Sequence, residues 1–416
     1  MEKNNKKRGR PIGSTNKPKS SFSVMKFDKQ IENAPIIKSN AQYGIMNYGK
    51  FNLYPYDIIN LYNTSVTMKA CVDFATNAIV GEGIDLDAMK IKDGDLENPN
   101  YYMSWTQFIR ALAFDFSLYS AFAFQIIRNK GGNTYSFFPQ PIETVRLEQM
   151  DEDGVINNAY LCKDWSVPTK YPPVKIPIFG FQDEKEIPMG VPYLFYYKQY
   201  NPVNAYYGLP VYSSALNCIQ AEAQFQIHNL KTITNGFTPM GAITLPQVET
   251  DEERKAIINN ISDMFTGALN ANNLLITFRD NIEDKPLEYT PFVQNTSNVN
   301  LYADATERTV NWIMAAFKIP SKALIGYPAD STGFSDSGAY MESAFALYNV
   351  NVANGNRREI LDVINNLFRM NGIETQIILK PLNYRIQDTQ NSQSDNNINT
   401  ETKTEDEVEE RENNTL

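Results

Sequence analysis

The 416-residue sequence predicts an α+β protein, in which helices and short strands occupy separate stretches of the chain. Apolar residues recur at helical spacing before residue 130 and again in the second half of the chain. Between residues 135 and 198 the pattern changes to short β-branched or aromatic runs that Pro, Gly and Asp divide. Residues 242–278 then alternate strand, helix and strand. Helices and strands that are separated in this way are typical of the α+β class.

The first half of the chain is expected to begin with two helices. One runs from Tyr56 to Ile79, where apolar residues recur every three or four positions until Gly81 stops the pattern. The second runs from about Trp105 to Arg128 and is apolar on most faces, so we expect it to be deeply buried. Strands are expected next, at residues 135–138, 144–149, 155–161 and 193–198.

The longest helix is expected at residues 208–235, where it would extend roughly 40 Å. It opens at Gly208-Leu209-Pro210, and Gly236 follows as a stop signal. One stripe is apolar and is formed by Tyr212, Leu216, Ile219, Ala223, Ile227 and Leu230. The neighbouring stripe is polar but almost uncharged, and it is formed by Asn217, Gln220, Gln224, His228, Lys231 and Asn235.

A compact β-α-β unit is expected after this helix. Strands at residues 242–245 and 274–278 flank a helix at 252–265, and Thr250 with Glu253 forms a capping box for that helix. The remaining elements are expected as helices at about 300–318, 338–353 and 357–370 and a strand at 375–379. Residues 328–338 are rich in Gly, Ser and Asp, which predicts a mobile loop that contains Asp330, Ser331, Thr332, Gly333, Ser335 and Asp336.

The two ends of the chain carry opposite charge around a net charge of −10. Residues 1–26 contain eight basic side chains and one acidic side chain, whereas residues 387–416 contain nine acidic and two basic side chains. Both ends are too polar to bury enough apolar area to offset the loss of chain entropy on folding. We therefore expect disordered tails at residues 1–44 and 387–416.

A short basic motif stands near the N-terminus. Lys6, Lys7, Arg8 and Arg10 surround Gly9 and precede Pro11, which resembles the core of an AT-hook. In such a hook a flat Arg-Gly-Arg turn enters the narrow minor groove of A·T-rich DNA, where the potential is most negative. The alternative is a generic basic tail attracted to phosphate or to an acidic protein surface.

The sequence contains few of the residue patterns that enzymes use for catalysis. Its one histidine, His228, lies on a polar helix stripe, and its three cysteines are far apart, so we expect no catalytic residues, no metal site and no cofactor. Gly44, Gly49 and Lys50 have the spacing of a phosphate-binding loop, but Phe51 stands where that loop needs Ser or Thr. No apolar stretch is long enough to span a bilayer, so no membrane partner is expected.

Three blocks in a fixed order resemble bacteriophage portal proteins of the tailed-phage type. The first runs from Tyr54-Pro55 to Gly83 and contains ACVDFATNAIVGEG. The second runs from Tyr207-Gly208-Leu209-Pro210 to Phe237, and the third from Phe265-Thr266-Gly267 through Phe317-Lys318-Ile319-Pro320 to Gly326. The resemblance covers about residues 45–380, and none of its blocks is a catalytic signature.

The resemblance implies a portal fold that assembles into a ring, usually of twelve subunits, at the unique vertex of a capsid. It implies a first stem helix at 208–235, a clip at 236–290, a second stem helix at 298–318 and a tunnel loop at 319–337. The wing would comprise residues 45–207 together with the helices and C-terminal strand of residues 338–386.

The implied function is a conduit through which double-stranded genomic DNA is packaged and ejected. The implied partners are the terminase motor, the major capsid or scaffold protein and a head-tail adaptor. The protein would be located in the virion after assembly in the cytoplasm of a bacterial host. The rival hypothesis is a DNA-binding regulator or adaptor that the AT-hook-like motif tethers to DNA.

Overall fold

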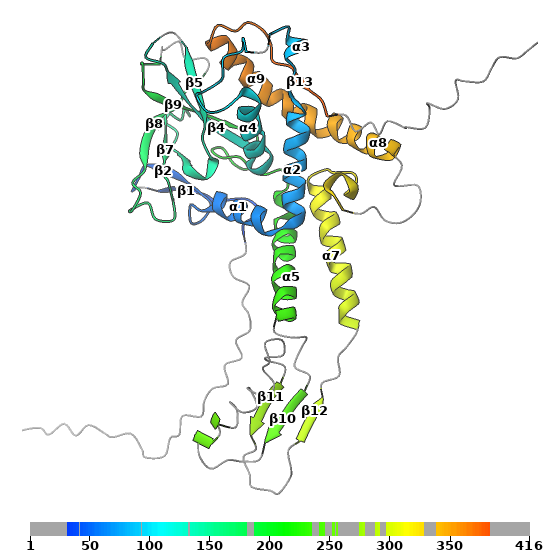
Figure 1. Cartoon of the computed structure of the whole chain (residues 1–416). Coiled ribbons are helices and arrows are strands. Elements are labelled where there is room, and N and C mark those ends of the chain that lie inside the picture. Colours follow the sequence, from blue (N-terminus) through cyan, green and yellow to red (C-terminus); the bar gives the residue numbers. More distant parts are fainter. Residues whose placement is uncertain are drawn as a thin grey trace, which may run out of the picture.

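The computed structural model describes most of the chain between residues 31 and 382 (Figure 1). The described residues are 31–40, 42–92, 94–131, 134–180, 187–234, 241–245, 252–253, 255–256, 274–278, 288–291, 297–327 and 338–382. Three parts are arranged one below another: a large body, a pair of long helices and a small sheet. We use these three names throughout.

The body is built around helices that pack on one another and on four small antiparallel sheets. Helix α1 (Tyr54–Thr64) leads into α2 (Val66–Val80), and α4 (Trp105–Tyr119) packs against both. The short α3 (Leu86–Met89) lies between α2 and α4 in the sequence. Two hydrophobic clusters form most of the core; α1 and most of α2 lie in the first, and α4 packs against α9 (Asn354–Met370) in the second.

The strands of the body form sheets of two or three members. One sheet has the order β5-β4-β9 and another the order β6-β7-β8, and all neighbours in both are antiparallel. A β1-β2 hairpin and a short β3-β13 pair complete the body. The strands are β1 (Ile37–Asn40), β2 (Ile45–Tyr48), β3 (Gly83–Ile84), β4 (Ala121–Arg128), β5 (Tyr135–Pro139), β6 (Val145–Leu147), β7 (Asn158–Leu161), β8 (Val174–Pro177), β9 (Pro192–Lys198) and β13 (Leu379–Lys380).

The helix pair consists of α5 (Leu216–Thr234) and α7 (Ser297–Ala316), which run side by side from the body towards the small sheet (Figure 1). The small sheet contains β10 (Gly241–Leu245), β11 (Leu274–Phe278) and β12 (Glu288–Pro291), in the order β11-β10-β12. Strands β10 and β11 are parallel, which requires a crossover between them. The predicted β-α-β strands are therefore confirmed, whereas most of the predicted helix at 252–265 lies outside the described residues.

Several expected boundaries are wrong. The helix expected from Trp105 to Arg128 ends at Tyr119, and the chain continues as β4. Ser120 marks the change, because it adopts a left-handed conformation (φ 53°) that terminates the helix. Strand β4 is buried on both faces in its first four residues, which removes the alternation that distinguishes a strand from a helix.

The helix expected over residues 56–79 is two helices. Ser65 has an extended backbone (φ −96°, ψ 117°), and its hydroxyl oxygen accepts a hydrogen bond from the Met68 N–H, so Ser65 is the N-cap of α2. The apolar pattern continues through this break because α1 and α2 bury residues in the same core cluster.

The long helix also begins later than expected. Residues 208–212 are not helical, η2 (Ser213–Ala215) is a 3-10 turn, and α5 begins at Leu216. Gly208 instead lies against the backbone carbonyl oxygens of Tyr119 and Ser120, where a Cβ atom would approach the Tyr119 oxygen to 2.4 Å. The glycine is therefore required for close packing on α4 rather than for opening a helix.

The C-terminal helices follow one another without the expected gap. Helix α8 (Gly338–Tyr348) leads through a π-helical turn (Asn349–Ala353) into α9 (Asn354–Met370). The strand expected at 375–379 is reduced to β13, which pairs with β3 and ties this end of the chain to the end of α2. Both termini expected to be disordered, at residues 1–44 and 387–416, lie largely or wholly outside the described residues, although residues 37–40 already form β1.

Candidate functional site

The helix pair is the candidate functional site because it connects the body to the small sheet. Its upper part is firmly packed. The Tyr212 ring, just before α5, stacks on Phe317, just after α7, with 4.4 Å between the ring centroids. Ile219 of α5 and Ile313 of α7 are both fully buried. The end of each helix that meets the body is therefore part of the hydrophobic core.

The middle of α5 and one side of α7 present apolar side chains to solvent. Ile227 and Leu230 continue the apolar stripe of α5, but 42% and 64% of their surface is exposed. Trp312 on α7 is 58% exposed. A single chain thus leaves part of the helix pair uncovered, and large exposed apolar side chains of this kind mark interaction surfaces.

The polar stripe of α5 lies where the sequence analysis expected a helix. Asn217 and Gln224 are exposed, and Gln220 is half-buried and accepts a hydrogen bond from the Ile31 N–H at 3.5 Å. The backbone of His228 and Lys231 continues the helix, but their side chains lie outside what the structure describes. Asn235, the last residue of the predicted stripe, lies outside the described residues, and the role of the stripe in any function remains a prediction.

One buried carboxylate joins α5 to the body, and the sequence analysis missed it. Glu222 is only 4% exposed. It accepts hydrogen bonds from the hydroxyl of Ser65, from the Thr67 N–H at 3.2 Å and from the Thr67 hydroxyl at 2.8 Å. These donors lie at the N-terminus of α2, where unpaired N–H groups and the helix dipole favour a negative charge.

The same network reaches the end of the segment that follows α7. Because the single hydroxyl hydrogen of Thr67 is donated to Glu222, the Tyr327 hydroxyl at 2.9 Å must be the donor to Thr67. Tyr327 therefore connects through Thr67 to Glu222. The only sequence signal for this anchor is that Glu222 is the sole acidic residue of α5.

The other predicted site residues fall outside the described residues. These are Lys6, Lys7, Arg8 and Arg10 of the AT-hook-like motif and Asp330, Ser331, Thr332, Gly333, Ser335 and Asp336 of the predicted loop. Their roles stay predictions.

The described part of the chain contains no group of three or more His, Cys, Asp or Glu side chains that could hold a metal ion. Within the same part, no helix combines the length and the apolar character needed to cross a membrane. The three cysteines are free thiols, and Cys71 and Cys162 are buried.

Comparison with known proteins identifies a family. The model of the phage portal protein family matches residues 89–413. No curated protein sequence matches the chain.

Two solved structures share the fold at low sequence identity. A chain from the virion of a native gene transfer agent particle is 18% identical, with a TM-score of 0.50, and the match covers 78% of this chain and 83% of that one. A chain from the neck of a native gene transfer agent particle, computed with C12 symmetry, is also 18% identical, with a TM-score of 0.51. That match covers 84% of this chain and 86% of the other.

Proposed function

The chain belongs to the phage portal protein family, and from this premise we propose that it forms a ring-shaped conduit for double-stranded DNA at one vertex of a phage-like particle. The family is structural rather than enzymatic, in agreement with the prediction that the chain is not an enzyme. The observation that carries the proposal is the pair of long helices with an exposed apolar side, set between a body and a small sheet (Figure 1).

Ring formation follows from that exposed apolar side. Ile227, Leu230 and Trp312 leave 42–64% of their surface in water, and covering this remaining surface with a second copy would contribute roughly 0.6–2 kcal/mol per side chain. A surface on one copy that packs against a different surface on the next generates a closed ring when the rotation closes. The neck of the gene transfer agent particle, computed with C12 symmetry, supports twelve copies.

The three parts of the molecule would correspond to the parts of a portal subunit. The body is the wing, formed by residues 45–207 and 338–386. The helix pair is the stem, with the first stem helix at 208–235, of which α5 occupies Leu216–Thr234, and the second at 298–318. The small sheet belongs to the clip at 236–290, and residues 319–337 would form the tunnel loop.

A conduit must let DNA slide. Each phosphate that a protein neutralises adds salt-dependent affinity and resists movement. The polar stripe of α5 carries amide side chains at Asn217, Gln220 and Gln224, and the whole chain is net negative at −10. A channel lined by such groups would guide DNA without holding it tightly.

The remaining partners follow from this role. A conduit at the vertex would meet the terminase motor during packaging, the major capsid or scaffold protein around its wing, and a head-tail adaptor after packaging. The protein would be assembled in the cytoplasm of a bacterial host and remain in the virion. The family match makes a free regulator tethered by the AT-hook-like motif the weaker hypothesis.

Two experiments test the proposal. Negative-stain images of the purified full chain should show rings, and images with only monomers or two-fold dimers at micromolar concentration would overturn it. Replacing Ser331 to Ser335 by a Gly-Ser linker of equal length should leave rings intact and reduce the DNA retained in assembled heads. Normal DNA retention by that variant would remove the tunnel role of the loop.

A further inference from the structure

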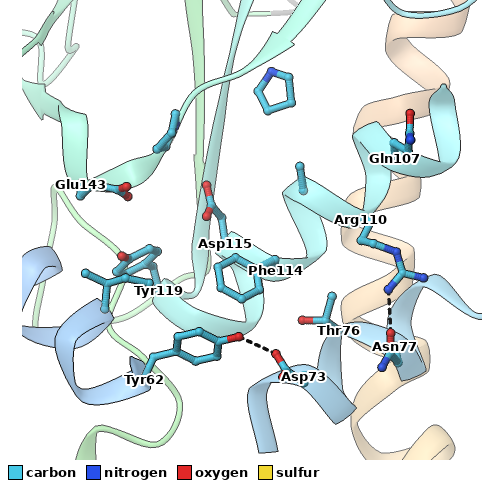
Figure 2. Close-up of a pocket in the computed structure, with 14 residues that line it drawn as sticks. Tyr62, Asp73, Thr76, Asn77, Gln107, Arg110, Phe114, Asp115, Tyr119 and Glu143 are labelled. Carbon is cyan, nitrogen blue, oxygen red and sulfur yellow. Dashed lines mark hydrogen bonds between the residues drawn. The ribbon is translucent and has the colours of Figure 1, made fainter. Parts of the chain in front are cut away.

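A pocket of about 740 Å³ opens on the body between α1, α2 and α4 (Figure 2). Its apolar lining includes Ile59, Ala111, Phe114 and Pro139. The pocket contains no part of the helix pair, so the proposed conduit does not account for it.

Two carboxyl groups, Asp115 of α4 and Glu143 of the 3-10 turn η1 (Ile142–Thr144), line the same pocket (Figure 2). Burial raises the pKa of both, and the Glu143 charge raises the pKa of Asp115 further. Burial also raises the pKa of the neighbouring Tyr119 phenol, and the charges of Glu143 and Asp115 raise it further. In the described part of the chain, no Lys or Arg forms an ion pair with either carboxylate.

The other charged groups that line the pocket are Asp73 and Arg110, which form hydrogen bonds with partners other than Asp115 and Glu143. Asp73 accepts a hydrogen bond from the Tyr62 hydroxyl at 2.7 Å and pairs with Lys69 at 3.2 Å. Arg110 lies on the rim, where it donates to the Asn77 side-chain oxygen at 2.7 Å (Figure 2).

Arg146 lies behind η1 and its charge lowers the pKa of Glu143, but its hydrogen-bond donors point elsewhere. They bind the Asn52 side-chain oxygen and the backbone oxygens of Asn52, Glu143 and Val145. Among the described residues, therefore, no Lys or Arg donates a hydrogen bond to the carboxyl group of Asp115 or Glu143, and both carboxyl groups line one pocket together with apolar side chains.

We propose that this pocket docks the basic N-terminal segment of the chain, residues 1–26, through a Lys or Arg side chain. The ammonium or guanidinium group would lie between Asp115 and Glu143. The methylene groups of the same side chain would pack on Phe114 and the other apolar side chains that line the pocket. Long basic side chains bury their stems and pair their charged ends in this manner. Charged donors to carboxylates form the strongest protein hydrogen bonds.

Charge and chain length both favour this occupant. Residues 1–26 hold eight of the 38 basic side chains of a protein whose net charge is −10. The described chain begins at Ile31, whose N–H contacts Gln220 of α5. Extended chain spans up to about 3.3 Å per residue, so the 25 steps along the chain from Lys6 to Ile31 can reach roughly 80 Å.

Docking gives the AT-hook-like motif a role that does not depend on a ring. While a basic side chain occupies the pocket it is unavailable to DNA, so the pocket and DNA phosphates compete for the same segment. Neutralising the pocket should then release the segment and strengthen binding to duplex DNA. The simplest alternative is an N-terminal segment that binds DNA and never enters the pocket. It predicts that neutralising the pocket leaves the affinity for duplex DNA unchanged.

The first test is photo-cross-linking in the full-length chain. A benzophenone amino acid replaces Phe114, and a matched control carries it at Tyr200, which is 86% exposed and does not line the pocket. The Phe114 probe should cross-link to residues 1–26, and the yield should fall at least fivefold when Asp115→Asn and Glu143→Gln are combined. No cross-link to residues 1–26 from the pocket, or equal yields with and without those substitutions, would overturn the proposal.

The second test measures DNA affinity of full-length proteins at low salt. Asp115→Asn with Glu143→Gln should tighten duplex binding about threefold to tenfold, since releasing one ion pair from competition is worth roughly one factor of ten at most. Asp87→Asn, which removes an acidic side chain of α3 outside the pocket, should change it less than twofold. Unchanged or weaker DNA binding in the pocket variant would contradict the competition. Neither test requires rings. A negative result in these tests therefore does not contradict the conduit proposal, and a failure to form rings does not contradict the docking proposal.

Discussion

The two ends of α5 differ in what surrounds them. At the upper end, Ile219 is fully buried and Glu222 is anchored to the N-terminus of α2. Further along, Ile227 and Leu230 expose the same apolar stripe to solvent. The difference teaches that one helix serves two purposes: its upper end stabilises the subunit, and its lower end is left for a second copy.

The largest effect on subunit stability is expected at the upper end. Phe317→Ala removes the ring that stacks on Tyr212 and should lower the free energy of unfolding by about 3–5 kcal/mol. Leu230→Ala, at an exposed position of α5, should lower it by less than about 0.5 kcal/mol. Denaturant unfolding of both variants, under conditions that keep the protein monomeric, measures the contrast. Equal losses in the free energy of unfolding would show that the two ends of α5 contribute equally to the stability of the subunit.

The next effect concerns the anchor itself. Glu222→Ala leaves the buried donors of Ser65 and Thr67 without an acceptor, so we expect a loss of about 1–3 kcal/mol in the free energy of unfolding. Gln224→Ala, two positions along and exposed, is the matched control and should cost under about 0.5 kcal/mol. If both variants unfold alike, Glu222 does not anchor α5.

A smaller effect is expected at the end of the network. Tyr327→Phe removes only the hydroxyl that donates to Thr67, so the expected loss is about 0.5–1.5 kcal/mol. In a double-mutant cycle, Tyr327→Phe and Glu222→Ala should be coupled through Thr67. Strictly additive losses would mean that Tyr327 and Glu222 act independently.

The pocket of the body predicts a pH dependence of stability. The pKa of Asp115 is raised in the folded protein, so its stabilising contribution is complete below the unfolded pKa of about 3.9 and is lost as pH rises through the folded value. In chains that lack residues 1–26, so that no basic side chain of that segment can occupy the pocket, Asp115→Asn should therefore be at least as stable as the unsubstituted protein at pH 7, and the difference should shrink towards low pH. Thermal melts of both proteins from pH 4 to 8 measure it. If Asp115→Asn is less stable than the unsubstituted protein at pH 7, the predicted sign of this stability difference is wrong.

The N-terminal segment is expected to have the smallest effect on folding and a large one on DNA. Removing residues 1–26 takes away eight basic side chains from a net negative protein, so retention of duplex DNA at low salt should fall sharply. Arg8→Ala with Arg10→Ala should abolish any preference for A·T-rich duplex. Unchanged retention by the truncated chain would show that the segment does not contact DNA.

Much of this architecture could be predicted from the sequence. Long helices with a 3.6-residue period and the parallel β10-β11 pair were predicted because their patterns are local. Strand β4 could not be distinguished from helix, since burial on both faces hides the alternation. Strand β12 was missed because its four residues, which end in Pro291, carry no strand pattern.

The candidate site was only partly predictable. The polar and apolar stripes of α5 follow from spacing, whereas the Glu222 anchor depends on Thr67, which is 155 positions away in the chain. The pocket likewise unites Asp115 with Glu143 through the packing of α4 on the strands. Contacts between distant segments leave no periodic signal, so only the folded structure reveals them.

The central claim is that a second copy of the chain covers the exposed end of α5. Light scattering of the full chain at micromolar concentration measures this directly. We expect a mass of about 570 kDa, twelve times the chain mass of 47.3 kDa, and Leu230→Asp should reduce it towards that of one chain while Val155→Asp, at an exposed turn of the body, should not. A wild-type mass of one or two chains, or full-sized rings of Leu230→Asp, would contradict the account.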